Sequence, residues 1–167
     1  MEQTGTAKKM IAVSDSAERE SYFLKLILSS CGHGAFSAAP ASGASNTSVL
    51  LSPEASMCPN PARFPVWVVR YPDTGSIDRR GYRKVITYSV KYSGADFTAR
   101  NIRTAANHTT SFEISGVGII GRVHLRTAEK TVVEAALAAA TAAIAAGVPF
   151  ADALEALNSS GPLKLPG

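Results

Sequence analysis

The chain has 167 residues, of which 46% are hydrophobic and 18% are charged. That apolar content excludes a chain that is disordered throughout, and the length is typical of one domain with one hydrophobic core. The formal net charge is +4, and the basic residues are spread along the chain. Dispersed charge of this kind gives no reason to expect nucleic-acid binding. We predict a single domain over residues 1–167.

The ends of the sequence and its cysteines bear on the cell compartment. The first residues contain no apolar segment of signal-peptide length, and the alanine run near the C-terminus is too short and small-sided to span a bilayer. Cys31 and Cys58 are the only cysteines, without a CxxC pair or a histidine cluster. They predict neither a zinc site nor a disulfide framework. We expect a cytoplasmic protein with two free thiols.

The chain begins with the pattern of a strand followed by a helix. Residues 10–13 are a short apolar run, and Ser14, Asp15 and Ser16 come directly after it. Each of these polar residues is favoured at a helix start. The apolar residues that follow recur at helical spacing, which predicts a helix over residues 17–30.

The middle of the chain changes composition abruptly. Residues 33–63 are rich in Ala, Ser, Pro, Gly and Asn, which predicts a flexible or partly disordered segment with one brief strand at 48–52. Two β-branched and aromatic runs follow at 65–71 and 84–90, and each predicts a buried strand. The roughly one dozen residues between them leave no room for a full crossover helix.

The last third contains a second group of strands and then helices. Runs rich in β-branched and aromatic residues, separated by polar or Gly breaks, predict an antiparallel meander over 96–102, 109–115 and 117–126. Alanine dominates residues 128–146 and predicts the longest helix, which a Gly ends. A Pro then opens a short helix over 150–157.

Short motifs in this part of the chain follow one another in an informative order. RYPDTG at 70–75 and KVITYS at 84–89 precede ADFTARNI at 95–102, TSFEISG at 110–116 and a helical segment at 133–157. This series resembles the central, ATP-dependent domain of Mur ligases. There a strand ends in Asn-x-Asp-Asp, the next reads Val-x-Thr-Tyr-Gly, and an Ala-Asp-hydrophobic-x-Ala-x-Asn-Ile segment and a Thr-x-Phe strand lead to a helix, a Gly-Ile-Pro turn and a short helix.

The resemblance implies an α/β fold like a truncated Mur ligase central domain, with a small sheet covered by helices and a β meander. Mur ligases join an amine to a carboxylate, often on a UDP-muramyl peptide, through an acyl phosphate made with ATP. That chemistry needs a Gly-rich loop that ends in Lys and Ser or Thr. No stretch matches GxxGK[ST], because SCGHG at 30–34 and SGVGIIG at 115–121 lack a Lys beside Ser or Thr.

Other family motifs are altered as well. The family's long helix begins with Gly-x-x-Asn-x-x-Asn, whereas residues 129–135 read EKTVVEA. Asp73 matches the first member of the Asp-Asp pair, and Thr74 takes the place of the second. The sequence contains no counterpart of the family's third domain, which binds the incoming amino acid. The resemblance therefore implies a degenerate family member.

Candidate ligand-binding residues are few. Arg79, Arg80, Arg83 and Lys84 form the one tight basic group, which is either a solvated loop or a phosphate contact. Together with Asp73 they are the candidate cofactor-binding residues.

Other polar residues have a structural interpretation beside a chemical one. Ser14, Asp15 and Glu18 stand where magnesium-binding acids are conceivable, but acids at a helix start more often serve the helix dipole. His108 and His124 are expected to be ordinary turn or sheet histidines and not general bases. We assign no catalytic residue and no metal site.

The leading hypothesis is a non-catalytic Mur-ligase-like domain that binds a UDP-muramyl-type ligand or a protein partner, including a second copy of itself, and needs no cofactor. The alternative is one subunit of a split ATP-dependent carboxylate–amine ligase, in which ATP and magnesium bind only if a partner chain supplies the phosphate loop. A third reading is an unrelated small α/β binding protein. None of the three involves a membrane.

Overall fold

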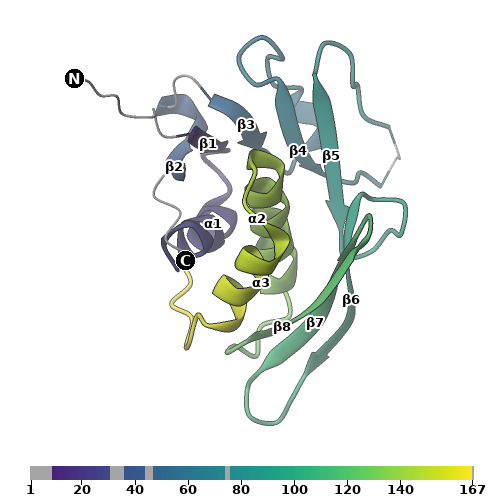
Figure 1. Ribbon diagram of the computed structural model, residues 1–167. Helices are drawn as coiled ribbons and strands as arrows, with labels where there is room; N and C mark the ends of the chain where they lie inside the picture. Colours follow the sequence, from purple (N-terminus) through teal and green to yellow (C-terminus); the bar gives the residue numbers. More distant parts are fainter. Residues whose placement is uncertain (1–8, 31–35, 44–46, 74–75, 167) are drawn as a thin grey trace, which may run out of the picture.

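The computed structural model describes residues 9–30, 36–43, 47–73 and 76–166. The strands form one eight-stranded sheet in the order β2-β1-β3-β4-β5-β6-β7-β8 (Figure 1). The strands are β1 (Lys9–Val13), β2 (Phe36–Pro40), β3 (Thr47–Leu51), β4 (Val66–Arg70), β5 (Lys84–Ser89), β6 (Phe97–Thr104), β7 (Thr110–Gly116) and β8 (Ile119–Leu125). The helices are α1 (Glu18–Ser30), α2 (Val132–Ala146) and α3 (Phe150–Asn158), with short 3-10 turns η1 (Ala41–Gly43) and η2 (Ala55–Met57).

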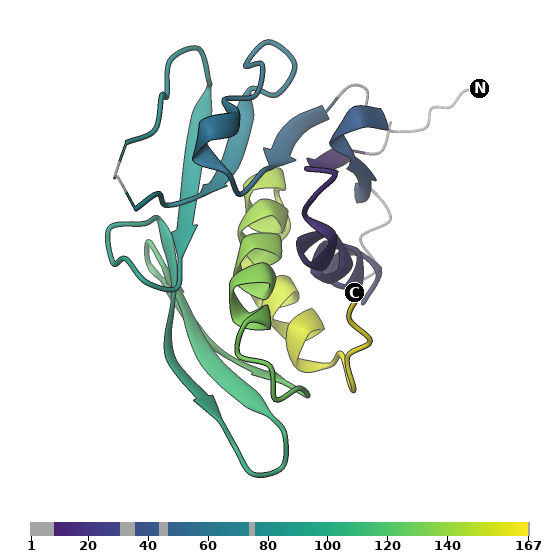
Figure 2. The same cartoon turned by 180° about the vertical axis from the view of Figure 1, so that it is seen from behind.

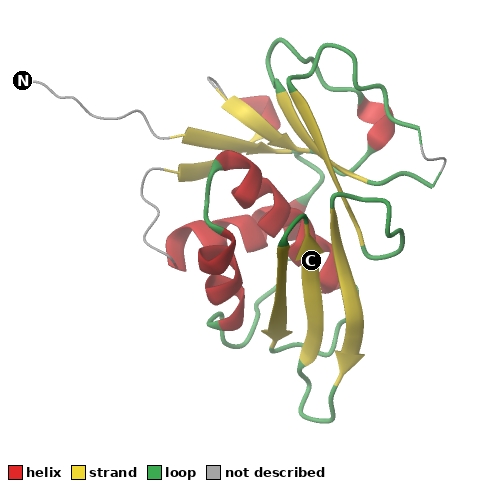
Figure 3. Ribbon diagram, turned by 45° about the vertical axis from the view of Figure 1, so that its right-hand side comes forward, coloured by secondary structure: helices red, strands yellow, loops and turns green. Residues whose placement is uncertain are grey.

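The sheet has a parallel part and an antiparallel part. Strands β2, β1, β3, β4 and β5 pair in parallel, and the first residues of β6 continue this pairing. Strands β6, β7 and β8 pair antiparallel, which confirms the predicted meander. They form an arm of the sheet that extends away from the other strands (Figure 3). The described residues between β4 and β5 contain no helix, as the short spacing predicts.

Residues 33–35 and 44–46 of the segment predicted to be flexible lie outside the described residues, and in the rest of 33–63 the expectation of a single brief strand is wrong. This segment contains β2, β3, η1 and η2, and β3 coincides with the brief strand expected at 48–52. Strand β2 (FSAAP) pairs along its length with β1. Backbone hydrogen bonds to an edge strand do not require large apolar side chains, so composition alone does not reveal such a strand.

Helix α2 lies at the centre of the core. Twelve of its 15 residues are buried, because it packs against β1, β3, β4, β5 and β6 on one side and against α1 and α3 on the other (Figures 1 and 2). Alanine side chains permit this close approach on every side. The helix begins at Val132, after a turn, and not at residue 128 as predicted; it ends as expected at Gly147, whose φ is 119°.

Loops cover the opposite face of the sheet. Trp67, Val69 and Val85 are buried there against Ile77 and Tyr82 from the connection between β4 and β5. The Trp67 and Tyr82 rings lie 5.3 Å apart between centroids. Helices therefore cover one face of the sheet, and the α/β architecture with its β meander is the one expected from the sequence. Among the described residues, no helix is long and apolar enough to cross a membrane.

Gly121 in β8 sets how closely α3 approaches the sheet. A Cβ at this position would lie 2.6 Å from Leu154 Cδ2 and 3.0 Å from Phe150 Cζ. We expect Gly121→Ala to lower the free energy of unfolding by about 1–2 kcal/mol through overpacking, measured by urea denaturation. Leu154→Ala in the same chain removes the clashing methyl group. The free energy of unfolding of the double variant should therefore fall by less than the sum of the decreases in the two single variants.

Gly43→Ala is the matched control, because nothing lies within 4 Å of the Cβ it would add. An equal loss of stability in Gly43→Ala and Gly121→Ala would contradict the packing argument.

Candidate functional site

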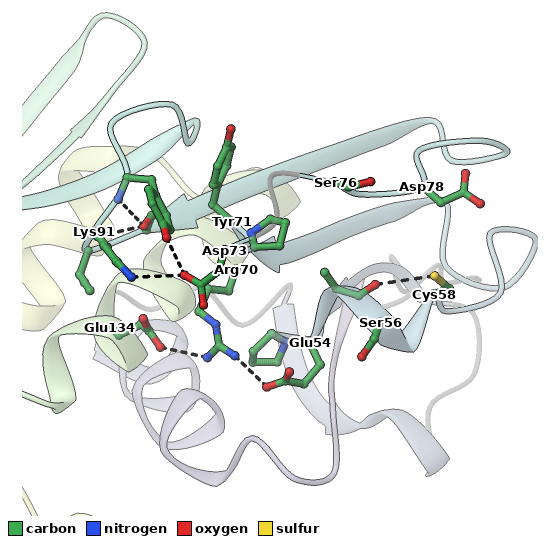
Figure 4. Close-up of a pocket in the computed structure, with 16 residues that line it drawn as sticks. Glu54, Ser56, Cys58, Arg70, Tyr71, Asp73, Ser76, Asp78, Lys91 and Glu134 are labelled. Carbon is green, nitrogen blue, oxygen red and sulfur yellow. Dashed lines mark hydrogen bonds and ion pairs between the residues drawn. The ribbon is translucent and has the colours of Figure 1, made fainter.

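A pocket of about 680 Å³ lies at the carboxyl edge of the parallel strands. The segments that follow β3, β4 and β5 surround it, and the start of α2 contributes one residue (Figure 4). In open sheets of this kind, ligands bind in crevices outside the carboxyl ends of the strands. This pocket is therefore the main candidate site.

Arg70, the last residue of β4, joins two walls of the pocket. Its Nη2 donates to Glu54 Oε1 at 2.8 Å, and its Nη1 donates to Glu134 Oε1 at 3.1 Å (Figure 4). Partial burial lowers the pKa of Arg70, but the Glu134 and Glu54 carboxylates outweigh burial and raise that pKa above its ordinary value. The guanidinium thus ties the segment after β3 to the first turn of α2.

Asp73 is the centre of a second cluster at the pocket rim. Its Oδ1 accepts a hydrogen bond from the Tyr92 hydroxyl at 2.6 Å and one from Lys91 Nζ at 3.4 Å. The hydrogen bonds from Tyr92 and then Lys91 lower the pKa of Asp73. Ser89 Oγ accepts from the backbone N–H groups of Lys91 and Tyr92, which fixes the turn that carries them.

The half-buried Glu20 of α1 and the buried Tyr88 of β5 interact electrostatically with the charges of the Arg70 bridge. Burial is the main cause that raises the pKa of Glu20, and the charge of Glu134 adds to it. Tyr88 is opposite Arg70 in the parallel register and is fully buried. Its hydroxyl has no hydrogen-bond partner among the described residues. Burial raises the pKa of Tyr88 well above its ordinary value, and the nearby charges include Glu20 and Glu134.

The N-terminal ends of α1 and α2 converge beside this cluster. Both helices line one crevice, where Arg19 Nη1 donates to Thr131 Oγ1 at 3.2 Å and Arg19 Nη2 pairs with Glu129 at 3.3 Å. Helix N-termini attract anions. In this chain, carboxylate side chains already lie in the first turns of both helices: Glu18 and Glu20 in α1, and Glu134 in α2.

The connection between β1 and α1 differs from the expected cap. Asp15 Oδ1 accepts the backbone N–H of Ser42 at 3.3 Å, and the hydrogen bonds from Ser42 lower the pKa of Asp15. Ser14 and Ser16 hydrogen-bond each other through their hydroxyls at 3.2 Å. The Asp15 carboxylate thus accepts a hydrogen bond from η1, which follows β2, and does not cap the first turn of α1.

The predicted cofactor-binding residues do not form one site. Asp73 follows the carboxyl end of β4 and lines the pocket. Lys84 begins β5, so it lies at the opposite end of the parallel strands. None of Arg79, Arg80, Arg83 and Lys84 lines the pocket. The structure therefore separates the basic group from Asp73.

Two members of the basic group have partners of their own. Arg79 Nη1 donates to the Val85 carbonyl at 3.3 Å, and Arg80 Nε pairs with Asp78 at 3.0 Å. The Arg80 side chain is 91% exposed, which agrees with the solvated-loop interpretation.

Sequence reasoning missed the residues that build the pocket. Arg70, Glu54 and Glu134 come from three separate segments, and only their spatial pairing identifies them. One signal was available: Arg70 and Glu134 are single charges within the otherwise apolar runs VWVVR and VVEAAL. Charged residues are rarely placed in such runs unless they have a partner.

The remaining candidates lie elsewhere. His108 is in the turn between β6 and β7, and the His124 backbone N–H in β8 donates to Asn158 Oδ1. Cys58 is free and exposed, whereas Cys31 lies outside the described residues. No cluster of three or more His, Cys, Asp or Glu able to hold a metal ion occurs in the part of the chain that the structure describes.

Comparison by sequence matches no family model and no curated protein. Comparison by structure matches Mur ligases. A UDP-N-acetylmuramoylalanyl-D-glutamyl-2,6-diaminopimelate–D-alanyl-D-alanyl ligase from Acinetobacter baumannii is similar over 95% of this chain and 47% of its own, with 16% identity and a TM-score of 0.69. A UDP-N-acetylmuramoyl-L-alanyl-D-glutamate–2,6-diaminopimelate ligase is similar over 97% of this chain and 48% of its own, with 14% identity and a TM-score of 0.70.

A pseudomurein peptide ligase type C from Methanothermus fervidus is similar over 98% of this chain and 51% of its own, with 16% identity and a TM-score of 0.60. The chain therefore has a Mur-ligase-like fold, as the motif order predicts. It spans about half the length of these structures.

Replacing Arg70 tests the bridge between Glu54 and Glu134. A lysine has one point charge and cannot bind two carboxylates with a rigid fork. We expect Arg70→Lys to lower the free energy of unfolding by about 1 kcal/mol, measured by urea denaturation. Arg122→Lys is the control, because Arg122 pairs with the single carboxylate of Glu113. Equal losses in the two variants would contradict the bridging role.

Glu20 should make stability depend on pH. Its pKa is raised above the ordinary value of 4.5, so the charged form is disfavoured in the folded state and stability increases as pH falls. We expect Glu20→Gln to raise the melting temperature at neutral pH, and the difference from the unmodified chain to disappear below pH 4.5. The exposed Glu155→Gln is the control. A Glu20→Gln effect that is constant across pH would contradict this assignment.

Proposed function

We propose that the chain is a non-catalytic, ligand-binding Mur-ligase-like domain related to cell-wall peptide ligases, and that it binds no nucleotide on its own. The observation that supports this proposal is the set of carboxylates at the N-terminal ends of α1 and α2. Glu18 and Glu20 lie in the first turn of α1, and Glu134 lies in the first turn of α2. These carboxylates take the positions at which helix dipoles would otherwise attract phosphate.

The connection between β1 and α1 supports the same conclusion. Residues 14–17 read SDSA and are followed by Glu18. A phosphate loop needs glycines, so that backbone N–H groups can approach the phosphates, and a lysine to meet their charge. This connection has neither, and Asp15 places a negative charge in it. A triphosphate would meet repulsion where a nucleotide-binding loop supplies attraction.

The ligand would bind in the pocket beside Arg70 and Asp73. The matched structures include ligases named for UDP-N-acetylmuramoyl peptides, and a UDP-muramyl-type compound is the corresponding candidate here. A protein partner or a second copy of the chain is the other class of occupant. We place the protein in the cytoplasm, as the sequence predicts.

The test of this function combines activity and binding. The chain is incubated with ATP, magnesium, a UDP-muramyl peptide and an amino acid, and ADP release is measured. The proposal predicts no ADP release and a rise in melting temperature with the UDP-muramyl peptide alone. ADP release above the background of a heat-denatured sample would contradict the non-catalytic role, and no thermal shift would contradict a UDP-muramyl ligand.

A split ligase is the second candidate. It is favoured by the match to structures of Mur ligases together with a sequence that has no GxxGK[ST] stretch. In this role ATP and magnesium would bind only with a partner chain that supplies the phosphate loop. Recovery of a chain that carries GxxGK[ST] in an affinity purification, with ADP release by the mixture, would favour this candidate over the first.

A further inference from the structure

We propose that the arm formed by β6, β7 and β8 docks an acidic segment of a partner protein, whose carboxylates bind Arg100, Arg103 and Arg126. The docking surface is the outer face of the arm, which points away from α2 and α3. No residue of the three strands lines the pocket beside Arg70. The inference therefore goes beyond the proposed function and does not rest on the ligand of that pocket.

The two faces of the arm differ in character because side chains alternate along each strand. Phe112 and Ile114 of β7 and Val123 and Leu125 of β8 are buried in the core with residues of α2 and α3, and these helices lie on one side of the arm (Figure 1). The residues between them are on the outer face. The charged residues of this face are Arg100, Arg103, Glu113, Arg122 and Arg126.

An irregularity in β6 puts two arginines on the same face. Arg100 and Arg103 are three residues apart, so they would point to opposite faces of a regular strand. The register shifts between them, and Asn101 has a φ of 55°. As a result both arginines are exposed, while Ile102 between them packs against the core.

Strand pairing gathers arginines that are dispersed in the sequence. Arg100 and Arg122 lie on either side of Glu113, and Arg103 is opposite the next outward residue of β7. Paired strands are about 4.8 Å apart, and alternate residues of one strand are about 7 Å apart. An extended acidic segment has the same spacing between its alternate side chains. The face therefore matches a row of carboxylates.

Glu113 is already fully engaged. Its Oε2 accepts from Arg122 Nη2 at 2.8 Å, and its Oε1 accepts from Asn101 Nδ2 at 2.7 Å. The other three arginines of the face form no ion pair and no side-chain hydrogen bond in the part of the chain that the structure describes. Their guanidinium groups are therefore available for carboxylates, which they can bind through two parallel hydrogen bonds.

Apolar side chains at one end of the face favour a protein over a nucleic acid. Ile120 is 68% exposed beside Arg122, and Val117 in the turn between β7 and β8 is 92% exposed. A partner protein can bury an apolar side chain there. The aromatic rings of the three strands, Phe97 and Phe112, pack in the core instead, so these strands present no Phe, Tyr or Trp ring on which a base could stack.

Asn158 of α3 determines the mode of docking. Its Oδ1 accepts the His124 backbone N–H at 2.7 Å, and its Nδ2 donates to the Arg122 carbonyl at 3.0 Å. These hydrogen bonds occupy the outer edge of β8, where another strand would otherwise add. The partner therefore binds through its side chains against the face. A second copy docked by the same face would bring arginines against arginines, which is repulsive.

The experiment is an NMR titration of the full chain at low salt with a nine-residue peptide that alternates Glu and Ser and ends in Leu. Saturable shifts of the amide signals of β6, β7 and β8 are expected. The control peptide has Gln in place of each Glu and is expected to cause no shifts. Absence of shifts with the acidic peptide, shifts confined to other elements, or equal shifts with both peptides would overturn the proposal.

A nine-nucleotide oligodeoxythymidylate is the third probe, because its phosphates can also bind arginines. It is expected to bind more weakly than the acidic peptide. Tighter binding of the oligonucleotide would overturn the assignment to a protein partner.

Variants then locate the docking surface. The double variant Arg100→Gln/Arg103→Gln is expected to weaken binding of the acidic peptide about fivefold. Arg83→Gln/Lys84→Gln is the matched control, because it removes two exposed positive charges at the far end of β5. Equal affinities of the two double variants would overturn the proposal. The amide spectrum of each variant verifies that it is folded.

Ile120→Ser tests the apolar contact. It is expected to weaken binding of the acidic peptide about twofold or more and to leave binding of the oligonucleotide unchanged. An unchanged affinity for the peptide would overturn the argument for a protein segment with an apolar side chain.

Discussion

The burial of α2 against the sheet is the constraint on which the other features depend. Its alanine side chains allow α1, α3 and five strands to approach one helix closely. This packing fixes where the first turn of α2 lies, and therefore where Glu134 meets Arg70. The ion pair between Arg70 and Glu134 joins two walls of the pocket, because Arg70 also pairs with Glu54 in the segment after β3.

Charge determines what such a fold can bind. In a parallel sheet with helices that start at its carboxyl edge, backbone geometry alone favours anions. This chain places Glu18 and Glu20 at the start of α1 and Glu134 at the start of α2, and its main pocket contains more carboxylates than cations. The carboxylates in these first turns take the positions at which the helix ends would otherwise attract phosphate, which is the basis of the proposal that the chain binds no nucleotide on its own.

The sequence predicted β1, β3 to β8 and all three helices, because their apolar residues form short runs or follow clear periods and most are bounded by clear stop signals. It missed β2 because an edge strand of small residues is held by backbone hydrogen bonds to β1. Of the five candidate binding residues that the sequence suggested, only Asp73 lines the pocket in the structure. Arg70, Glu54 and Glu134 are far apart in the chain, and their pairing depends on helix and strand packing that no local pattern encodes.

The proposed function requires that this chain, with its Mur-ligase-like fold, has no nucleotide site of its own. Isothermal titration calorimetry of the isolated chain with ATP and magnesium tests this claim directly. No saturable heat of binding is expected. A saturable heat with one ATP per chain would contradict the proposed function.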